Sequence, residues 1–225
     1  MHQAAQKKMA MVFWLLALVD IAGIAANVPI LHFIAKPLLI PALLILLVIT
    51  RSAAPGKNLL LAGLFFSWMG DMFLLFEYAN KLFFIFGLAS FLTTHIFYIV
   101  YFLRIRSANI SLLKKQPLLL ALVPAYGIIL VWQLYPHLKD LKIPVMLYAA
   151  VICTMLLCSL HIFLKVNRKA ARYYVTGAAA FVISDSLLAI DKFYQPFAYA
   201  GVFIMLTYCA AQYCIVQGYI EQDNL

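Results

Sequence analysis

The sequence predicts an all-α integral membrane protein, a single domain (residues 1–225) folded as a bundle of eight transmembrane helices. Of its 225 residues, 66% are hydrophobic and 11% are charged, and the mean hydropathy is +0.98. A soluble domain of this size cannot bury that much apolar surface. Apolar runs of about 20 residues, the length that crosses a bilayer, recur along the chain. The connections between these runs are too short to hold a second folded domain.

The first four spans are expected near 9–27, 30–50, 58–76 and 82–103. The first span follows Lys7 and Lys8, as the apolar core of a signal peptide does. However, it contains Asp20, and the second span begins only two residues after it ends. We therefore expect the first span to be retained as a membrane helix.

The last four spans are expected near 116–135, 144–165, 171–190 and 196–220. All four cysteines lie within the sixth and eighth spans, and they show neither a CxxC pattern nor a Cys/His spacing typical of a metal site (Cys153, Cys158, Cys209 and Cys214). Cysteines buried in spans do not indicate a disulfide framework.

The basic residues are distributed unevenly between alternate loops. Of the 17 Lys and Arg residues, twelve precede the first span or lie around the loops after spans two, four and six, while four lie in the other loops. The remaining one, Lys36, lies inside a span. The positive-inside rule then places both termini in the cytoplasm. The net charge of +9 therefore indicates orientation and contact with membrane lipids, and no nucleic-acid partner is expected.

Two aspartates occupy matching positions in two similar spans. The segment from Gly63 to Asp71 aligns with the segment from Gly177 to Asp185 at an offset of 114 residues (185 − 71). A carboxylate in hydrocarbon costs roughly 2.5 to 3.5 kcal/mol on insertion scales, so it is a functional candidate by default. Residues with i, i+4, i+7, i+8 spacing share one face of a helix, and two such sets end at the aspartates: Gly63, Ser67, Gly70 and Asp71, and Gly177, Phe181, Ser184 and Asp185. We expect this face to point into the bundle.

The same offset pairs Gly87 with Gly201. It suggests a weak internal repeat of two four-helix halves in parallel orientation, as some membrane folds have.

Other polar groups lie at a similar depth. Asp71 and Asp185 are each five residues from the end of a span, about 8 Å below the surface. Lys36 and Asp20 are placed at nearly the same level, and His95 lies near mid-membrane. A cation and three carboxylates in one layer indicate a buried cavity or a pore mouth.

Each of these residues also has a structural alternative. The two aspartates could form a hydrogen-bonded pair that holds two helices together, Lys36 could extend outward as an anchor, and His95 could be a hydrogen-bonded core residue. Ser67 and Ser184 are candidates for hydrogen bonds to the neighbouring acids.

The sequence offers little support for a metal or another cofactor. A zinc site needs three or four converging ligands, and only His95, Asp71 and Asp185 could contribute. The chain has no HExxH, Walker or GxSxG motif. We therefore expect no cofactor, and we rank a zinc-dependent lipid amidase below the alternatives that follow.

Two buried carboxyls beside a lysine are suited to acid–base chemistry. Burial and mutual repulsion favour the neutral form of one acid, while the lysine favours the charged form of the other. Glycosidases use such a pair to cleave acetals through an oxocarbenium-like cation. The position in the membrane indicates a substrate that partitions into lipid. The same residues would also suit a proton-coupled transporter or a lipid-binding membrane protein.

Five short segments, considered together in their order and spacing along the chain, resemble those of a known family. They are Lys36-Pro37, Ser67-Trp-Met-Gly70-Asp71, Gly87-(x)3-Phe91-(x)3-His95-(x)2-Tyr98, Gly177-(x)3-Phe181-Val-Ile-Ser184-Asp185-Ser-Leu-Leu-Ala189, and Tyr208-(x)3-Gln212. Together they resemble the YhhN-like family, which includes the transmembrane lysoplasmalogenases. The resemblance extends over almost the whole chain.

This resemblance implies a hydrolase that cleaves the vinyl ether bond of a lysoplasmalogen, a lysophospholipid, to a fatty aldehyde and a glycerophospho-base. Asp71 and Asp185 would then be the catalytic acid and base, and the sequence leaves open which is which. The residues implied to bind substrate are Lys36, Ser67, His95, Tyr98, Ser184, Tyr208 and Gln212. The chain fits a bacterial inner membrane, and its oligomeric state is left open.

Overall fold

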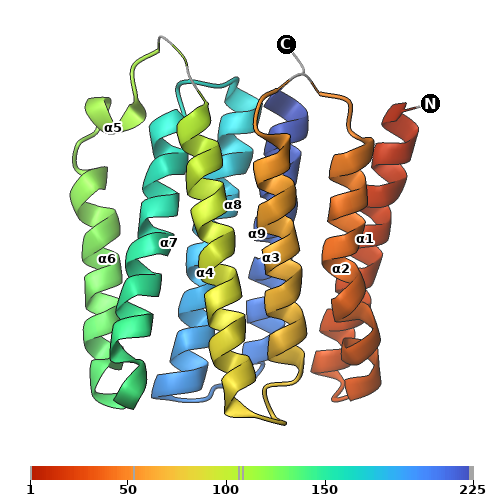
Figure 1. Cartoon of the computed structure of the whole chain (residues 1–225), viewed down its shortest axis with the longest axis vertical. Helices are drawn as coiled ribbons and strands as arrows, with labels where there is room; N and C mark the ends of the chain where they lie inside the picture. Colours follow the sequence, from red (N-terminus) through yellow and green to blue (C-terminus); the bar gives the residue numbers. More distant parts are fainter. Residues whose placement is uncertain (1, 53, 106, 108, 223–225) are drawn as a thin grey trace.

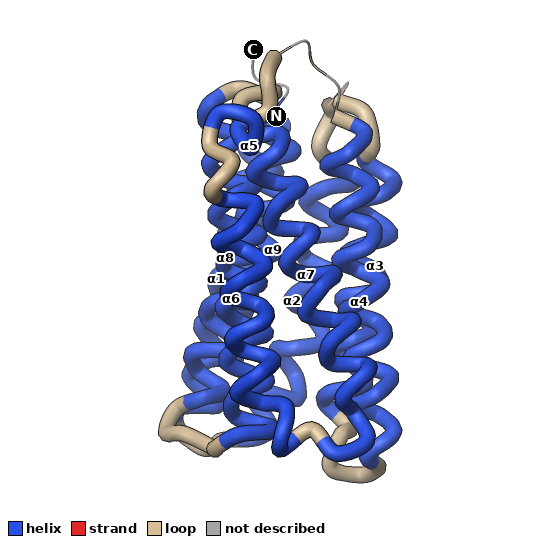
Figure 2. The backbone as a smooth tube through the Cα atoms, turned by 90° about the vertical axis from the view of Figure 1, so that its left-hand side faces the viewer, coloured by secondary structure: helices blue, strands red, loops and turns tan. Residues whose placement is uncertain are grey.

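The protein is a bundle of eight long helices, as the sequence predicts. The computed structural model describes residues 2–52, 54–105, 107 and 109–222, and every regular element within these ranges is helical. Eight helices are long and apolar enough to span a membrane. Figures 1 and 2 show them side by side along one common direction. The chain is thus an integral, multi-pass membrane protein.

The long helices match the expected spans. They are α1 (His2–Ala25), α2 (Pro29–Ile49), α3 (Lys57–Leu75), α4 (Lys81–Arg104), α6 (Leu119–Leu134), α7 (Lys142–Ile162), α8 (Arg168–Ala189) and α9 (Ala200–Gln222). Helix α1 begins seven residues before the expected span (9 − 2), because the Ala, Gln and Lys residues there favour helix.

Four short elements join the long helices. Two 3-10 turns, η1 (Tyr135–His137) and η2 (Lys139–Leu141), connect α6 to α7, and a π-helical turn, η3 (Ile190–Tyr194), extends α8. The short helix α5 (Leu112–Lys115) was not expected from hydropathy. Its first turn is capped by Ser111, whose hydroxyl accepts a hydrogen bond of 3.2 Å from the backbone N–H of Leu113.

The helices pack chiefly as consecutive antiparallel pairs. Helices α1 and α2, α3 and α4, and α8 and α9 form the most extensive contacts. In Figure 1 the pair α1 and α2 lies at one edge of the bundle and α6 at the opposite edge. Of the fully described helix α6, only Gly127 and Leu134 are buried, so this helix is the most peripheral one in the bundle.

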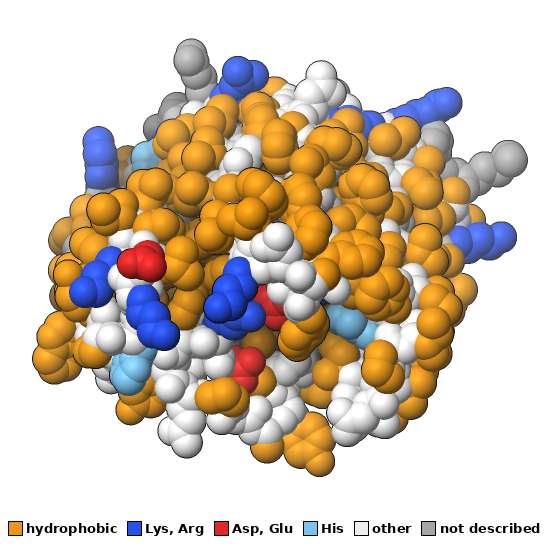
Figure 3. Space-filling model, turned by 60° about the horizontal axis from the view of Figure 1, so that its bottom comes forward, with side chains coloured by type: hydrophobic (Ala, Val, Ile, Leu, Met, Phe, Trp, Pro, Cys, Tyr) orange, Lys and Arg blue, Asp and Glu red, His pale blue; other side chains and the backbone are white. Residues whose placement is uncertain are grey.

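The outer surface suits a hydrocarbon environment. Large apolar side chains on the flanks are exposed, among them Trp132 at 76% and Ile128 at 68%. Figure 3 shows hydrophobic side chains over the flanks and charged side chains gathered around the ends of the bundle. Orientation across the membrane remains a prediction. Arg106, one of the basic residues on which it depends, lies outside the described residues.

Helix α2 is hydrogen-bonded to α3 through the backbone carbonyl of Pro37, which Pro41 leaves without a helical partner. The carbonyl of Pro37 has no helical partner because residue 41, four positions later, is also proline and lacks an N–H. The indole N–H of Trp68 donates a hydrogen bond of 3.0 Å to this carbonyl. A side chain of α3 thereby satisfies a polar group that lipid could not. This contact fixes α2 against the segment that carries Asp71.

Helix α4 approaches α3 closely over two glycines. A Cβ atom at Gly63 would lie 2.5 Å from the Tyr98 ring, and one at Gly70 would lie 2.7 Å from the Phe91 ring. Only glycine leaves room for these two aromatic rings. The small residues on the face of α3 that carries Asp71 therefore allow Tyr98 to pack at Gly63 and Phe91 to pack at Gly70, next to that aspartate.

We predict that Trp68→Phe will destabilise the protein by about 1–3 kcal/mol, because it leaves the Pro37 carbonyl without a donor. Thermal unfolding in detergent measures this effect as a lowered melting temperature. Trp132→Phe is the matched control, since Trp132 is 76% exposed on the lipid-facing surface and should tolerate the change. Equal melting temperatures for the two variants would show that the Trp68 hydrogen bond contributes little.

Candidate active site

Asp71 lies at the end of a chain of buried hydrogen bonds. The hydroxyl of Tyr208, on α9, donates a hydrogen bond of 2.6 Å to Asp71 Oδ2. Tyr208 Oη in turn lies 2.9 Å from Ser67 Oγ, and Gln212 Nε2 donates to the same serine oxygen. Tyr98, on α4, donates a hydrogen bond of 2.8 Å to Gln212 Oε1. Helices α3, α4 and α9 thus meet at one polar network inside the bundle.

The directions of these hydrogen bonds are consistent throughout the chain. Because the Tyr208 proton is donated to Asp71, Ser67 must donate its own proton to Tyr208 Oη. Ser67 Oγ can still accept a hydrogen bond, and it accepts one from the Gln212 N–H. Each donor therefore has an acceptor. Asp71 is 2% exposed, and Ser67, Tyr98 and Gln212 are fully buried. A satisfied network of this kind holds the Asp71 carboxyl in one orientation.

Asp185 belongs to a second network, formed by α4, α7 and α8. The Tyr148 hydroxyl donates a hydrogen bond of 2.6 Å to Asp185 Oδ2, and His95 Nε2 lies 3.2 Å from the same oxygen. His95 Nε2 also lies 3.0 Å from the Tyr148 hydroxyl. Each of the two aspartates therefore has a tyrosine hydroxyl as its shortest partner.

The state of His95 follows from its two ring nitrogens. Nδ1 is buried and has no hydrogen-bond partner among the described residues. A neutral imidazole with its proton on Nε2 satisfies the contact to Asp185, whereas a proton on Nδ1 would be buried without an acceptor. In this tautomer His95 is a hydrogen-bond donor to the carboxylate.

The two networks are adjacent but are separated by aromatic rings. The Phe181 ring lies 5.1 Å from the His95 ring and 5.9 Å from the Tyr208 ring, measured between centroids. Phe91 lies 5.8 Å from Tyr208 in an edge-on arrangement. In the part of the chain that the structure describes, no hydrogen bond joins one network directly to the other. Asp71 and Asp185 are thus not a directly hydrogen-bonded pair.

Three further polar residues, Asp20, His32 and Lys36, lie on the Asp71 side of the bundle. Asp20, which is fully buried, is 2.8 Å from His32 Nδ1 through Oδ1, while its Oδ2 has no partner among the described residues. Lys36 is 8% exposed, so it does not extend outward as an anchor. Lys36, Asp20 and His32 lie within electrostatic range of the Asp71 carboxyl. Within the described residues, however, Lys36 forms no ion pair within 4.0 Å.

Sequence reasoning placed some of these residues and missed others. Ser184 donates its hydroxyl proton to the carbonyl of Ile204 at 3.1 Å, so it holds α8 against α9 and does not bond Asp185. Tyr148 was missed, although it lies on the buried stripe of α7 with Val145 and Ile152. A tyrosine on the apolar face of a span needs an acceptor for its hydroxyl, which is the signal that could have identified it.

Two small cavities adjoin Asp185. Each has a volume of about 50 Å³, and both are lined by Asp185 and Tyr148. The first also contacts Leu74 and Phe91, so it extends towards the helix that carries Asp71. The Asp185 side chain is 18% exposed, in contrast to the enclosed Asp71. Asp185 is therefore the acid with access to open space.

Groups that could hold a metal are scarce. Among the described residues, no three or more His, Cys, Asp or Glu side chains lie together in a suitable arrangement. The four cysteines are free thiols. The chemistry that the site can support with its own side chains is proton transfer by the carboxyls and hydrogen bonding by tyrosine, histidine and glutamine.

Comparison with known proteins gives the family. The YhhN family matches residues 31–219, which include both networks. The chain belongs to the YhhN family. No solved structure matches this protein.

Several curated relatives of this YhhN family member have a functional name. "Lysoplasmalogenase TMEM86A" from Bos taurus is 31% identical over 171 residues, which cover 74% of this chain and 67% of the relative. "Lysoplasmalogenase TMEM86B" from Sus scrofa is 33% identical, with coverage of 77% and 69%. "Lysoplasmalogenase" from Mycobacterium bovis is 29% identical, with coverage of 84% and 71%.

We predict that Gln212→Leu will lower the melting temperature in detergent, because it leaves the buried Tyr98 hydroxyl without its acceptor, at a cost of about 1–3 kcal/mol, and removes the N–H that Ser67 accepts. Gln217→Leu on the same helix is the control, since Gln217 bonds only within α9, to Glu221 four residues later.

The double variant Tyr98→Phe/Gln212→Leu provides a second check. It removes both members of one hydrogen bond, so its destabilisation should be smaller than the sum of the two single effects. Strict additivity would mean that the Tyr98–Gln212 bond does not couple these helices.

Proposed function

We propose that this protein hydrolyses the vinyl ether bond of lysoplasmalogens and releases a fatty aldehyde and a glycerophospho-base. One observation carries the proposal: two aspartates inside an apolar bundle are each held by a tyrosine hydroxyl at 2.6 Å. Two oriented carboxyls in a lipid-exposed protein suit acid–base chemistry on a lipid. The names of the curated relatives supply the substrate class.

The reaction needs one proton donor and one proton acceptor. A neutral carboxyl protonates the alkenyl carbon that does not bear oxygen, and the carbon bonded to oxygen becomes an oxocarbenium ion. The second carboxyl, as its anion, stabilises this cation and takes a proton from the water that attacks it. The second carboxyl, now protonated, gives its proton to the glycerol oxygen, which leaves as a hydroxyl. The first carboxyl, now an anion, takes the proton of the hemiacetal hydroxyl as the aldehyde forms. One water is consumed, and both carboxyls regain their starting states.

The surrounding side chains give each carboxyl its orientation. Tyr148 and His95 both donate to Asp185 Oδ2, which leaves the other Asp185 oxygen available for the reacting lipid. Tyr208 performs the same role for Asp71. Lys36, which is buried on the neighbouring helix α2, lies within electrostatic range of Asp71. We infer that the reacting bond lies beside Asp185, the acid that lines both small cavities.

Asp71→Asn and Asp185→Asn are each expected to reduce aldehyde release from lysoplasmenyl-ethanolamine by about 10²- to 10⁴-fold, because each removes a proton-transfer group. The measurement is aldehyde production by purified protein in detergent, with folding checked by thermal unfolding. Asp140→Asn is the matched control, since Asp140 is exposed at the end of the bundle and should leave the rate unchanged.

Failure of the folded wild-type protein to release aldehyde would overturn the proposed reaction. In that case proton-coupled uptake by liposomes would test the transporter alternative, which uses the same buried acids. Retention of full activity by either Asp71→Asn or Asp185→Asn would remove that residue from the proposed pair.

The proposed protonation at carbon has an isotopic signature. In D2O the aldehyde should carry one deuterium on the carbon next to the carbonyl, because the added proton comes from the acid and ultimately from solvent. Mass spectrometry of the trapped aldehyde measures this label directly. An unlabelled aldehyde from the same reaction would contradict protonation of the alkenyl carbon, even if the bond is cleaved.

A further inference from the structure

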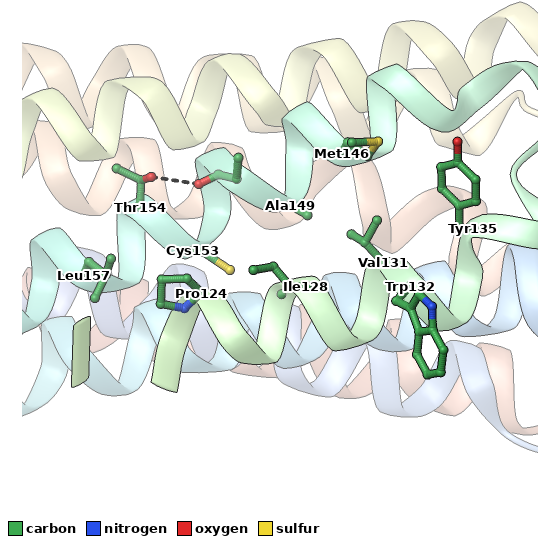
Figure 4. A pocket seen from close by; sticks show the side chains of 12 residues that line it. Pro124, Ile128, Val131, Trp132, Tyr135, Met146, Ala149, Cys153, Thr154 and Leu157 are labelled. Atoms are coloured by element: carbon green, nitrogen blue, oxygen red, sulfur yellow. Dashed lines mark hydrogen bonds between the residues drawn. The ribbon is translucent and has the colours of Figure 1, made fainter. Parts of the chain in front are cut away.

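A large cavity lies apart from the two aspartates, between α6 and α7. It has a volume of about 610 Å³ and is almost entirely apolar. Figure 4 shows Pro124, Ile128 and Trp132 on one wall, and Cys153 and Leu157 on the other. Ile128 and Trp132 are strongly exposed, so the cavity is a groove that opens to the lipid-facing surface.

The dimensions of the groove match a single hydrocarbon chain. Its α6 wall extends from Pro124 to Tyr135 and its α7 wall from Met146 to Leu157. At 1.5 Å per residue, each wall is about 16 Å long. That length is about half of a hydrocarbon core some 30 Å thick, which is the depth of one leaflet. The volume also falls within the range of about 300–1,000 Å³ that is common for ligand sites.

The groove adjoins a cavity that is lined by Asp185. Four residues line both the groove and the small cavity between α6, α7 and α8: Gly127, Val131, Ala149 and Cys153. Of these, Gly127 is the closest point, because a Cβ atom added there would lie 2.7 Å from Cys153 Sγ. Asp185 and Tyr148 lie on the inner side of this boundary. A lipid in the groove is therefore one layer of small side chains from the acid.

A lysine side chain, that of Lys142, lies at one end of the groove. Lys142 Nζ lies 4.5 Å from the centre of the Tyr135 ring, which lines that end. Tyr148 follows Lys142 by six residues on α7, about 9 Å along the helix. A phosphate beside Lys142 would therefore place the first atoms of an attached chain near the depth of Tyr148 and Asp185. The remainder of the chain would continue along the apolar walls towards Pro124 and Leu157.

We propose that the groove between α6 and α7 binds the single hydrocarbon chain of a lysophospholipid, with the phosphate near Lys142 and the ether linkage at the boundary formed by Gly127, Ala149 and Cys153. This inference rests on the proposed function and adds the route by which substrate reaches Asp185, laterally from the bilayer. The absence of a side chain at Gly127 keeps this boundary thin beside the linkage, while the open side of the groove allows the aldehyde to return to lipid.

A binding experiment tests the groove independently of catalysis. The probe is a saturated 1-O-alkyl lysophosphoethanolamine with a diazirine near the end of its chain, which has no vinyl ether to cleave. After irradiation of the purified wild-type protein, peptide mass spectrometry should locate the label on residues 124–135 and 146–157. Excess unlabelled alkyl lysolipid should remove it. Label that is spread over all lipid-facing helices and resists competition would identify ordinary surrounding lipid and overturn the proposal.

A kinetic experiment tests the direction of the chain. Thr154→Trp fills the end of the groove away from Lys142, and Thr154 is exposed and bonds only its own helix, at the Ala150 carbonyl. We expect kcat/KM for a long-chain lysoplasmalogen to fall at least about tenfold relative to a short-chain one. Leu147→Trp is the control, because Leu147 is 53% exposed on α7 outside the groove and should keep the wild-type ratio.

The outcomes separate this inference from the proposed function. Aldehyde release with an unchanged chain-length ratio in Thr154→Trp, together with dispersed labelling, would reject the groove and retain the hydrolase. Competed labelling of the groove without aldehyde release from a vinyl ether substrate would retain the lysolipid site and reject the reaction.

Discussion

The structure depends on the need of every polar group in hydrocarbon to find a partner within the protein. An unpartnered hydroxyl or carboxyl there costs several kcal/mol, so the polar side chains decide which helices meet. The Tyr208–Asp71 bond joins α9 to α3, and the Tyr148–Asp185 bond joins α7 to α8. The free Pro37 carbonyl adds α2 through Trp68. Apolar packing alone would not select these neighbours, since lipid tails contact apolar helices equally well.

Close helix approach makes these bonds possible. Gly63 and Gly70 allow the rings of Tyr98 and Phe91 to lie against α3, and from there Tyr98 reaches Gln212 on α9. A side chain at either glycine would displace a ring, and in the case of Gly70 the displaced Phe91 is also the ring that lies against Tyr208. The glycines therefore act on the carboxyl geometry indirectly, by fixing the positions of aromatic residues.

Hydropathy predicted the eight spans well because the cost of a helix in lipid is a sum over its own residues. The same local reasoning identified Asp71, Asp185, Lys36 and His95 as candidates. It could not identify their partners, because a hydrogen bond between α7 and α8 depends on how two distant segments pack. Tyr148 was therefore missed, and the role of Ser184 was expected to be different. The short helix α5 was missed because its four residues are too few to give a periodic signal.

The predicted internal repeat allows the surroundings of Asp71 and Asp185 to be compared position by position. At the offset of 114 residues, Tyr98 corresponds to Gln212, and these two are hydrogen-bonded to each other. His95, which contacts Asp185, corresponds to Cys209, a buried residue of α9. The tyrosines break the pattern, since Tyr208 corresponds to Thr94 and Tyr148 corresponds to Ile34.

Matching positions thus hold two aspartates in unlike surroundings. Asp71 is enclosed beside Lys36, and Asp185 is open to a cavity. Unlike surroundings favour different protonation states for the two carboxyls, as an acid and a base that act together require.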